Sequence, residues 1–485
     1  MTQKPSDMGM TQEESLLWEK GKAGRCAFSM PQRDVDRVQL PSDLIGDLPD
    51  LPELSEVDLV RHYTRLSQWN FGIDTGMYPL GSCTMKYNPK VNDHCAQFQG
   101  FAGAHPLLPV EWAQGVLRLL FRLERLLAAI TGMDAVTLQP AAGAQGELVG
   151  MLMIRAYHHD RNENRPTILV PDTAHGTNPA SATLCGFKPV GVKSNEAGML
   201  TLQAVAEVMD EQTAGIMVTN PNTLGFFEEH IQEICHIVHE KGGLVYCDGA
   251  NLNAIMGVVD MAKTGVDVLH LNLHKTFSSP HGGGGPGAGP VCVKERLEPF
   301  LPIPRIIKEK DQYGLSERSP RSVGRIHAFY GNVGVMIRAY AYILTMGAEG
   351  LRKASQMAVL NANYVKERLK ADFHLPYDRV CMHECVFSDQ YQRPHKVTTL
   401  DMAKRLMDYG FHPPTVYFPL VVNGAIMVEP TETESKDELD HFIAACRAIA
   451  REAETDPRLL LKAPHQLKLR RLDETLAARR PCLTG

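Results

Sequence analysis

The stretch 266–290 (VDVLHLNLHKTFSSPHGGGGPGAGP) places one lysine, Lys275, after an apolar run and before a glycine-rich loop. His274 precedes the lysine, and the four glycines at 282–285 let the backbone approach a ligand closely, at a cost in chain entropy. A lysine held in such a place can lose its proton and become a nucleophile toward a carbonyl group. Most lysines at strand ends are simply solvated, so this chemistry needs partner residues from elsewhere in the chain.

Polar side chains also close other apolar runs, where parallel strands are expected to end. Strand-like runs at 167–175, 214–222 and 243–251 alternate with helix-like segments at 199–211 and 227–241. This alternation predicts a parallel sheet covered on both faces, and ligands of such sheets lie beyond the carboxyl ends of the strands. The polar residues expected at that edge are Gln139, Asp172, His175, Asn220, Asn222, Asp248, His274 and Lys275.

Three of these residues together match the needs of pyridoxal 5'-phosphate. Lys275 is expected to form the Schiff base with the cofactor's aldehyde, and Asp248 to pair with the pyridine nitrogen and keep it protonated. His175 is expected to stack on the ring. The small residues at 141–146 precede an apolar helix, and free N–H groups at a helix N-terminus bind phosphate. The strand-end residues expected to contact the cofactor are Asn222, Asp248, His274 and Lys275.

Competing motifs carry less weight. The glycine run formally satisfies the dinucleotide fingerprint G-x-G-x-x-G, but that motif should open a helix, and here it precedes the strand-like segment PVCVK. Cys381 and Cys385 flank His383, yet this fragment lacks the second half of a zinc site. We therefore expect ordinary packing there and no metal. The chain also lacks the G-x-x-x-x-G-K-[ST] motif of nucleoside triphosphatases.

The segment 78–89 (YPLGSCTMKYNP) mixes glycines, prolines and aromatic residues without periodicity. This pattern favours an ordered functional loop, although a loop that merely packs is an equal alternative. Lys86 lies in it and is expected to be exposed. The position of the 78–89 loop relative to the sheet distinguishes a functional loop from a loop that merely packs.

Length and composition limit the possible classes. A chain of 485 residues suggests about two to four domains and can bury a large core. Its 50 basic and 56 acidic residues give a formal charge of −6, which offers no electrostatic case for nucleic acid or an anionic membrane. The 11 dispersed cysteines and an N-terminus without a signal peptide favour the cytoplasm. The apolar helix expected at 116–130 carries four charges and so does not span a membrane.

The order of the segments predicts three parts. Residues 1–100 form an N-terminal arm without its own core, followed by the functional loop. Residues 101–345 form the large α/β domain, and a long helix is expected from residue 335 to about residue 353. Residues 346–485 form a smaller α+β domain, in which Ser435 opens a helix with Glu438 as its capping-box partner.

Across seven stretches, which include the Lys275 segment and the 78–89 loop, the chain resembles the C-terminal-half subunit (subunit 2) of two-subunit glycine dehydrogenases (decarboxylating), the P-proteins of the glycine cleavage system. Gln145 and Ala288 depart from the histidine and serine expected at those positions, and neither belongs to the proposed catalytic set. The matching stretches span most of the chain: YPLGSCTMKYNP (78–89), QPAAGAQGEL (139–148), DTAHGTNPASA (172–182), TNPNTLGFFE (219–228), YCDGANLNA (246–254), NLHKTFSSPHGGGGPG (272–287) and VEPTETESK (428–436).

The resemblance implies the fold type I of pyridoxal-phosphate enzymes, like that of aspartate aminotransferase. This is an α/β fold with a mostly parallel sheet in the large domain and a smaller C-terminal α+β domain. The resemblance places Ala142, Gly143 and Ala144 at the cofactor phosphate. It also places part of the 78–89 loop near the glycine substrate, at Ser82, Thr84, Tyr87 and Asn88.

The reaction that the resemblance implies is decarboxylation of glycine with transfer of the aminomethyl group to the lipoyl-lysine of H-protein, releasing CO₂. The implied partners are a homologous subunit 1, with two copies of each subunit in a heterotetramer, the lipoylated H-protein, and indirectly T-protein and L-protein. Two rivals stay open. One is a non-catalytic scaffold half of the same complex. The other is an aminotransferase or a desulfurase, and a desulfurase would need Cys83 as its nucleophile.

Overall fold

Two compact units, 1–75 and 76–485, make up the chain. The compact units divide after residue 75, whereas the sequence predicts the first domain boundary at residue 100, and that domain boundary stays a prediction. The glycines at 282–285, expected to give room to a ligand, lie outside the described residues. The computed structural model describes residues 14–47, 49–105, 108–281, 287–327, 330–467 and 469–483.

The described part of the first unit has little regular structure and almost no core. Its helix α2 begins at Ser55, whose hydroxyl accepts the N–H of Asp58. Among its described residues, Leu54 is the single buried apolar side chain, whereas Trp18, Phe28 and others are exposed. The division into an arm and two domains stays a prediction. Its helices are α1 (Leu17–Lys20), the 3₁₀-helix η2 (Ser42–Leu44) and α2 (Glu56–Gln68).

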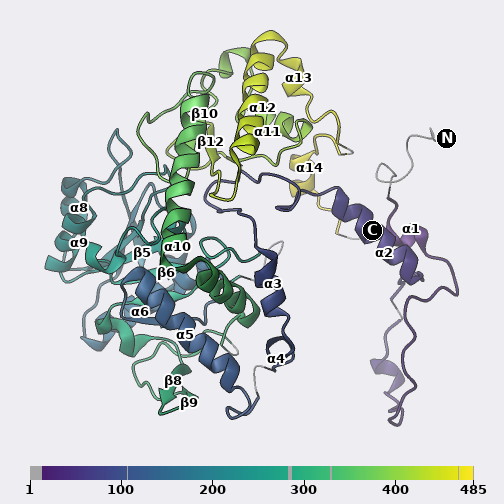
Figure 1. The fold of residues 1–485 in the computed structure, drawn as a ribbon, viewed down its shortest axis with the longest axis horizontal. Coiled ribbons are helices and arrows are strands. Elements are labelled where there is room, and N and C mark those ends of the chain that lie inside the picture. The colour runs from purple at the N-terminus through teal and green to yellow at the C-terminus, as the bar shows by residue number, and fades with distance from the viewer. Residues whose placement is uncertain are drawn as a thin grey trace. The chain divides into compact units, whose positions relative to one another are not determined.

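A seven-stranded sheet forms the centre of the second unit (Figure 1). Its strand order is β1-β7-β6-β5-β4-β2-β3. Strands β2 to β6 pair with one another in parallel, whereas β7 is antiparallel to β1 and β6. This confirms the predicted, mostly parallel sheet. The strands are β1 (Ala135–Thr137), β2 (Thr167–Pro171), β3 (Lys188–Val192), β4 (Thr213–Thr219), β5 (Leu244–Gly249), β6 (Val268–Leu271) and β7 (Val291–Val293).

Alternate residues of the central strands face opposite sides of the sheet and belong to two separate apolar clusters, one on each side. In β4, Ile216 belongs to one cluster and Met217 to the other. Helix α6 (Gly143–Asp160) packs on the Met217 side, and α5 (Gln114–Thr131) and α9 (Ile231–Glu240) pack on the Ile216 side. Because both faces are covered, the edge at the strand ends is left for polar residues.

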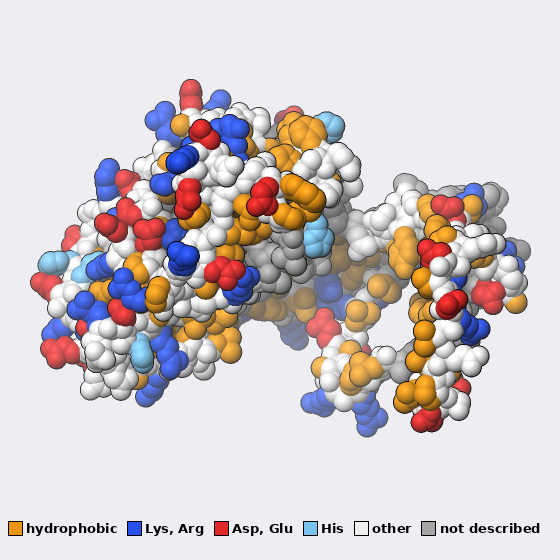
Figure 2. Space-filling view, turned by 90° about the horizontal axis from the view of Figure 1, so that it is seen from below, with side chains coloured by type: hydrophobic (Ala, Val, Ile, Leu, Met, Phe, Trp, Pro, Cys, Tyr) orange, Lys and Arg blue, Asp and Glu red, His pale blue; other side chains and the backbone are white. Residues whose placement is uncertain are grey.

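Shorter elements complete the part of the unit around the sheet. On the face of the molecule shown in Figure 2, Lys and Arg side chains are interspersed with Asp and Glu side chains, as the near-balanced composition suggests. None of the described helices is long and apolar enough to cross a membrane. The remaining elements are α3 (Lys90–Ala96), α4 (Gln99–Ala102), α7 (Thr177–Leu184), α8 (Leu202–Val208), η3 (Leu252–Ala254), η4 (Met261–Thr264), η5 (Glu295–Phe300), β8 (Arg305–Glu309) and β9 (Gln312–Ser316).

Helix α10 (Val333–Leu369) leads from the sheet to the C-terminal part (Figure 1). It is longer than the helix expected at 335–353, and its backbone breaks at Gly347 (φ 61°), beside the predicted domain boundary at 345/346. Ser435 accepts the N–H of Glu438, as predicted for a helix start. The elements that follow α10 are β10 (Cys385–Ser388), η6 (Arg393–His395), α11 (Thr399–Asp408), β11 (Thr415–Val416), β12 (Ala425–Val428), α12 (Lys436–Thr455), α13 (Arg458–Leu461) and α14 (Glu474–Arg479).

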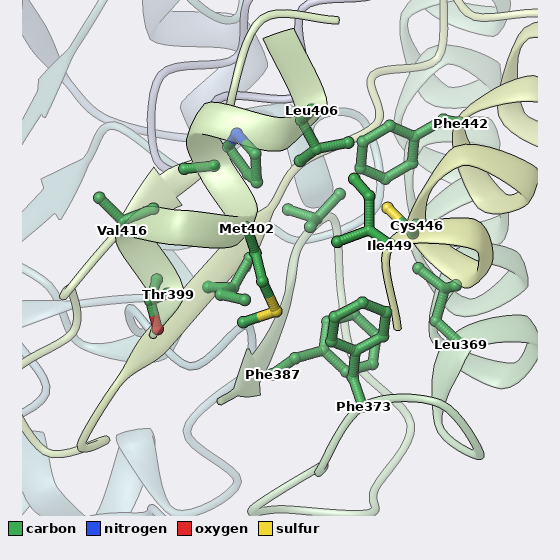
Figure 3. A pocket seen from close by; sticks show the side chains of 14 residues that line it. Leu369, Phe373, Phe387, Thr399, Met402, Leu406, Val416, Phe442, Cys446 and Ile449 are labelled. Carbon is green, nitrogen blue, oxygen red and sulfur yellow. The ribbon is translucent and has the colours of Figure 1, made fainter. Parts of the chain in front are cut away.

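An apolar cluster of its own fills the C-terminal part, beside a three-stranded antiparallel sheet of order β10-β12-β11. A cavity of about 20 Å³ lies inside it, between side chains such as Phe387, Met402 and Phe442 (Figure 3). A buried water needs at least two polar partners, and Thr399 is the one polar residue of the lining. This cavity is therefore a packing gap and not a ligand site.

Candidate active site

Four of the eight predicted strand-end residues, His175, Asp248, His274 and Lys275, line one cavity of about 410 Å³, whereas Gln139, Asp172, Asn220 and Asn222 are not part of its described lining. Lys275 follows β6, Asp248 is the penultimate residue of β5, and His175 follows β2, so three strands bring them to the same edge of the sheet. The cavity is lined by Gly143, Ala144, Glu147, His175, Gly176, Thr177, Asp248, Ala250, His270, Asn272, His274 and Lys275.

Helix α6 begins at this cavity without a side-chain cap. Its N-cap residue, Ala142, is extended (φ −157°, ψ 167°), and Gly143 and Ala144 begin the helix. A Cβ atom on Gly289 would lie 2.1 Å from the carbonyl oxygen of Ala142, so the neighbouring chain runs tightly against the helix start. The first N–H groups of a helix lack partners within the helix and carry partial positive charge. The start of α6 is therefore suited to an anion.

Asp248 is a buried carboxylate held on both oxygens. Its Oδ2 accepts from Nδ1 of His175 at 2.8 Å and from Nδ2 of Asn178 at 3.1 Å, and its Oδ1 accepts the N–H of Ala250 at 3.0 Å. Burial alone would raise the pKa of Asp248, but the adjacent His270 and His175 hold it well below its usual range. The carboxylate is therefore a fixed negative charge at the end of β5.

Lys275 lines the same cavity as Asp248, and two histidines that are neutral at pH 7 lie near it in the chain. Its Nζ donates to the carbonyl oxygen of Ser82 at 2.8 Å. Burial, followed by the neighbouring positive groups, lowers the pKa of His274 to about 3 and that of His281 to about 4. Nδ1 of His274 is buried and has no hydrogen-bond partner among the described residues. The lysine thus has an acceptor for one of its protons and a polar atom nearby that lacks a partner.

The 78–89 loop brings one of its four predicted substrate residues to the site. The hydroxyl of Ser82 lies 3.0 Å from Nε2 of His175. Thr84 is fully buried, and both its N–H and its hydroxyl donate to a carboxyl group. The side chain of Tyr87 is exposed, and Nδ2 of Asn88 donates to the carbonyl oxygen of Lys86 and to the hydroxyl of Ser278. Thr84, Tyr87 and Asn88 are absent from the described lining of the cavity, so their predicted substrate contacts stay predictions.

Asn222 lies away from the cavity lining. Its Nδ2 donates to the carbonyl oxygen of Gly198 and to Glu228, both at 3.0 Å. Its Oδ1 accepts two N–H groups of the turn that follows it. All its hydrogen-bonding positions are used in folding that turn, so the prediction that Asn222 contacts a cofactor finds no support in this geometry.

Lys86 is buried, at 3% exposure, and the expectation that it is exposed is wrong. Its ammonium donates to Glu432 at 2.7 Å, to Asn253 at 2.9 Å and to the carbonyl oxygen of Thr276 at 2.7 Å. The sequence pattern did not reveal this, because its partners lie far away in the chain. These contacts show how the 78–89 segment packs, and its role as a functional loop stays a prediction.

Family comparisons agree with this arrangement. Residues 354–463 match the model described as glycine dehydrogenase, C-terminal domain, and residues 150–315 match the model of class-V aminotransferases. The chain is 55% identical over 475 residues to the probable glycine dehydrogenase (decarboxylating) subunit 2 of Caldanaerobacter subterraneus subsp. tengcongensis, covering 97% of this chain and 98% of that protein. It is 54% identical over 480 residues to the protein of the same name from Halalkalibacterium halodurans, covering 98% of each. The chain belongs to the glycine dehydrogenase (decarboxylating) subunit 2 family.

A solved structure supports the fold of this glycine dehydrogenase family member. The crystal structure of a glycine decarboxylase (P-protein) of the glycine cleavage system, in inhibitor-bound form, superposes with a TM-score of 0.73. It covers 84% of this chain and 93% of that one at 19% sequence identity. At that identity the likeness shows the fold alone. Together with the class-V aminotransferase match, it confirms the predicted aspartate-aminotransferase-like fold class.

Several residues at the site of this subunit 2 family member were not predicted. His270 and Asn272 alternate with leucines in the stretch LHLNLHK, so they share a side of the strand with His274. That alternation is a signal from which both could have been found. The others, which carry no comparable signal, are Glu147, Thr177, Asn178, Glu384 and Glu429.

The C-terminal cysteines pack as expected. Cys381 and Cys385 are buried free thiols in the apolar cluster of the C-terminal part. His383 between them lies instead beside two glutamates, with its Nε2 3.9 Å from an oxygen of Glu384 and 3.9 Å from an oxygen of Glu429. The interpretation of the two cysteines as packing residues is therefore confirmed, and the histidine belongs to a different group.

Proposed function

We propose that this chain catalyses the pyridoxal-phosphate-dependent decarboxylation of glycine and transfers the aminomethyl group to the lipoyl-lysine of H-protein, releasing CO₂. The observation that carries the proposal is the meeting of Lys275, Asp248 and His175 at one cavity, in a member of the glycine dehydrogenase (decarboxylating) subunit 2 family. A non-catalytic scaffold subunit has no need to keep this combination.

The residues around the cavity fit pyridoxal 5'-phosphate in charge and in shape. The uncapped start of α6 offers N–H groups to a phosphate dianion. Asp248 offers a permanent negative charge to a protonated pyridine nitrogen. Nδ1 of His274 is a buried polar atom without a partner among the described residues, as expected where a ligand completes a site. Gly143 and Gly289 keep bulk away from the helix start.

Each residue of the set has a definite task in this proposal. Bound pyridoxal phosphate supplies an electron sink for the bond that breaks at glycine. Lys275 binds the cofactor covalently through Nζ, and Asp248 keeps the pyridine nitrogen protonated. His175 is held at one ring nitrogen by Asp248 and at the other by Ser82, so its plane is fixed for stacking.

The proposal includes partners. Relatives carry the name subunit 2, and we infer a homologous subunit 1, with two copies of each subunit in a cytoplasmic heterotetramer. The lipoyl-lysine arm of H-protein must reach the cavity to accept the aminomethyl group. T-protein and L-protein would act on later intermediates and need no contact with this chain.

The test is the exchange of labelled bicarbonate into the carboxyl group of glycine. We expect exchange that requires this chain, a subunit 1 and lipoylated H-protein, and that is lost in Lys275→Ala together with the visible absorbance of the bound cofactor. Circular dichroism of the variant should match that of the wild type. If the absorbance persists in Lys275→Ala, this chain is the scaffold half and not the catalytic one.

Other enzymes of the same cofactor class predict different results. An aminotransferase would exchange amino groups with 2-oxoacids and would not require H-protein. A desulfurase needs a mobile cysteine thiolate, but burial raises the pKa of Cys83, against the opposing charge of Lys275. Cys83 is therefore a poor nucleophile at neutral pH, and the geometry favours the decarboxylase.

A further inference from the structure

The loop at Ser82 has an unfavourable backbone conformation. Ser82 (φ 60°) and Thr84 (φ 45°) both lie in the left-handed region, which residues other than glycine seldom occupy. Gly81 before them runs so close to β12 that a Cβ atom there would lie 2.2 Å from the side chain of Met427. Such a conformation persists only where the surroundings hold it.

Two glutamates of the C-terminal part hold this loop. Oε2 of Glu384 accepts the N–H of Ser82 at 2.7 Å. Oε2 of Glu429 accepts the N–H of Thr84 at 2.9 Å, and its Oε1 accepts the hydroxyl of Thr84 at 2.5 Å. Glu384 precedes β10 and Glu429 follows β12, and because Cys385 pairs with Val428 in that antiparallel ladder, the two glutamates are neighbours.

The glutamates and His383 form a buried group of titratable side chains. Glu384 and His383 are fully buried, and Glu429 is 1% exposed. Neither ring nitrogen of His383, nor Oε1 of Glu384, has a hydrogen-bond partner within the described part of the chain. Two carboxylates this close in a buried place do not readily ionise together. A proton on one of them would satisfy part of this unmet hydrogen-bonding capacity.

The charges around the group favour a proton as well. Burial, followed by the like charge of Glu429, raises the pKa of Glu384 well above its usual value. Burial raises the pKa of Glu429 to about 7, and burial with nearby Lys275 and His175 lowers that of His383 to about 3. The other titratable groups that interact with His383, Glu384 and Glu429 are the side chains of Cys83, His175, Lys275 and Glu432.

The other side of Ser82 faces the active site. Its carbonyl oxygen accepts from Nζ of Lys275 at 2.8 Å, and its hydroxyl lies 3.0 Å from His175. We propose that Glu384 and Glu429 are a carboxyl clamp that carries one shared proton, fixes the left-handed loop at Ser82, and thereby positions Lys275. The inference rests on the proposed function only for the role of Lys275, and the clamp itself is independent of it.

A bound cation is the competing explanation. The separations of 3.9 Å between Nε2 of His383 and an oxygen of each glutamate would also suit a metal ion. A cation would require both carboxylates to be ionised, whereas the clamp requires one to be protonated. The clamp therefore predicts the infrared band of a protonated carboxylic acid and no bound metal. A cation site predicts a bound metal and no such band.

The first experiment measures the proton directly. Infrared spectra of the complex with subunit 1, stripped of cofactor, are recorded at pH 7 for wild type and Glu384→Gln. We expect the difference spectrum to show the band of a protonated carboxylic acid in the wild type, with no stoichiometric metal by elemental analysis. Absence of the band, or one metal ion per chain, overturns the shared proton.

The second experiment measures the effect on the lysine. The rate at which acetic anhydride modifies Lys275 in the cofactor-free complex is followed by mass spectrometry against pH, because only the uncharged amine reacts. Glu384→Ala and Glu429→Ala free the loop and so displace the carbonyl oxygen of Ser82, which accepts the lysine's proton. We therefore expect the midpoint of the modification rate against pH to fall by about one pH unit, a tenfold change in the ionisation constant. Glu384→Gln keeps an oxygen for Ser82 and should shift it by less than about 0.3 unit.

Controls separate positioning from general destabilisation. Thr84→Val removes one clamp hydrogen bond in an isosteric side chain and should lower the midpoint by less than the alanine variants, which keeps the test open if those fail to fold. Glu228→Gln alters another buried acid, one that does not line the cavity, and should leave the midpoint unchanged. An unchanged midpoint in Glu384→Ala, or an equal shift in Glu384→Gln, contradicts the clamp. If the bicarbonate exchange fails but the midpoint of lysine modification shifts as expected, the proposed function is wrong and the clamp is not.

Discussion

The ammonium group of Lys86 and the carboxylate of Glu432 form an ion pair at 2.7 Å, between residues 346 positions apart, with side chains 1% and 8% exposed. Burial would lower the pKa of Lys86, but Glu432 and Tyr342 raise it. The same ammonium donates to the carbonyl oxygen of Thr276, the residue after Lys275. The pair therefore ties the 78–89 loop both to the C-terminal part and to the turn that carries the active-site lysine.

Lys86→Met should destabilise the protein strongly, because it leaves a buried carboxylate unpaired, which costs about 3–5 kcal/mol. The measurement is the midpoint of thermal unfolding of the complex. Lys436→Met is the matched control: its pair with Asp440 is exposed, and exposed pairs contribute little to stability because water screens them. The double variant Lys86→Met/Glu432→Leu should recover part of the loss. Equal losses in Lys86→Met and Lys436→Met would contradict the buried pair.

Asp248→Asn should abolish most activity while the fold stays intact. Asparagine keeps the shape of the side chain but removes the charge that keeps a pyridine nitrogen protonated, and loss of one preorganised electrostatic group typically slows a reaction by about 10²–10³-fold. Because His270 and His175 hold the pKa of Asp248 low, the wild-type carboxylate stays ionised from about pH 5 upward. The rate of bicarbonate exchange by the wild type should therefore show no decrease toward pH 5 that comes from protonation of Asp248. Wild-type exchange rates in Asp248→Asn would refute its assignment.

The fold was largely predictable because the central strands are near-continuous apolar runs with polar ends. That pattern arises from burial on both faces, so it identified β2, β4, β5 and β6 and the edge at which Lys275, Asp248 and His175 meet. The extent of α10 was not predictable, because Gly347 breaks the helix geometry without ending the helical segment. Local patterns say where a helix is favoured, and packing decides how far it continues.

The predictable part of the site came largely from strand ends, whereas the two glutamates that hold the Ser82 loop came from segments beside the other sheet. Glu384 and Glu429 flank strands of a different sheet from the one that Lys275 follows, and no spacing in the sequence connects them with Ser82. Asn222 shows the opposite case. It ends an apolar run as expected, but its turn folds back and uses the whole side chain internally. A polar residue at a strand end is therefore only a candidate ligand-binding residue. It can bind a ligand when the fold leaves one of its hydrogen-bonding positions unused.

Gly289→Ala should weaken cofactor binding without unfolding the protein. A Cβ atom there would lie 2.1 Å from the carbonyl oxygen of Ala142 and 2.5 Å from its carbonyl carbon. The backbone at the start of α6 must then move, and its N–H groups lose their alignment on the phosphate. We expect the dissociation constant of the cofactor, measured by fluorescence titration, to rise by about tenfold or more, equivalent to about 1.4 kcal/mol.

Gly115→Ala is the control for that substitution. Gly115 lies in α5, and a Cβ atom there meets nothing within 4 Å. Alanine favours a helix over glycine by about 0.5–1 kcal/mol, so this variant should be slightly more stable and should bind the cofactor as the wild type does. Equal affinities in Gly289→Ala and Gly115→Ala would show that the start of α6 does not hold the phosphate.

Glu228→Gln should change how stability depends on pH. Burial raises the pKa of Glu228 to about 7, although Asn222 and the N–H of Leu200 donate to it, whereas an unfolded glutamate has a pKa of about 4.3. Between these values the unfolded chain releases its proton while the folded chain keeps it. The wild type therefore loses stability as pH rises from about 4 to 7, by about 4 kcal/mol, and loses no more above that range.

Glutamine stays uncharged at every pH, so the variant should lack this loss. Its thermal midpoint should be close to that of the wild type near pH 5, where both side chains are largely uncharged in the folded state, and should exceed it near pH 7.5. Glu196→Gln, which changes an exposed glutamate, should run parallel to the wild type over the same range. If the midpoints of Glu228→Gln and wild type fall in parallel as pH rises, Glu228 is ionised in the folded protein well below pH 7, and its burial does not control the titration.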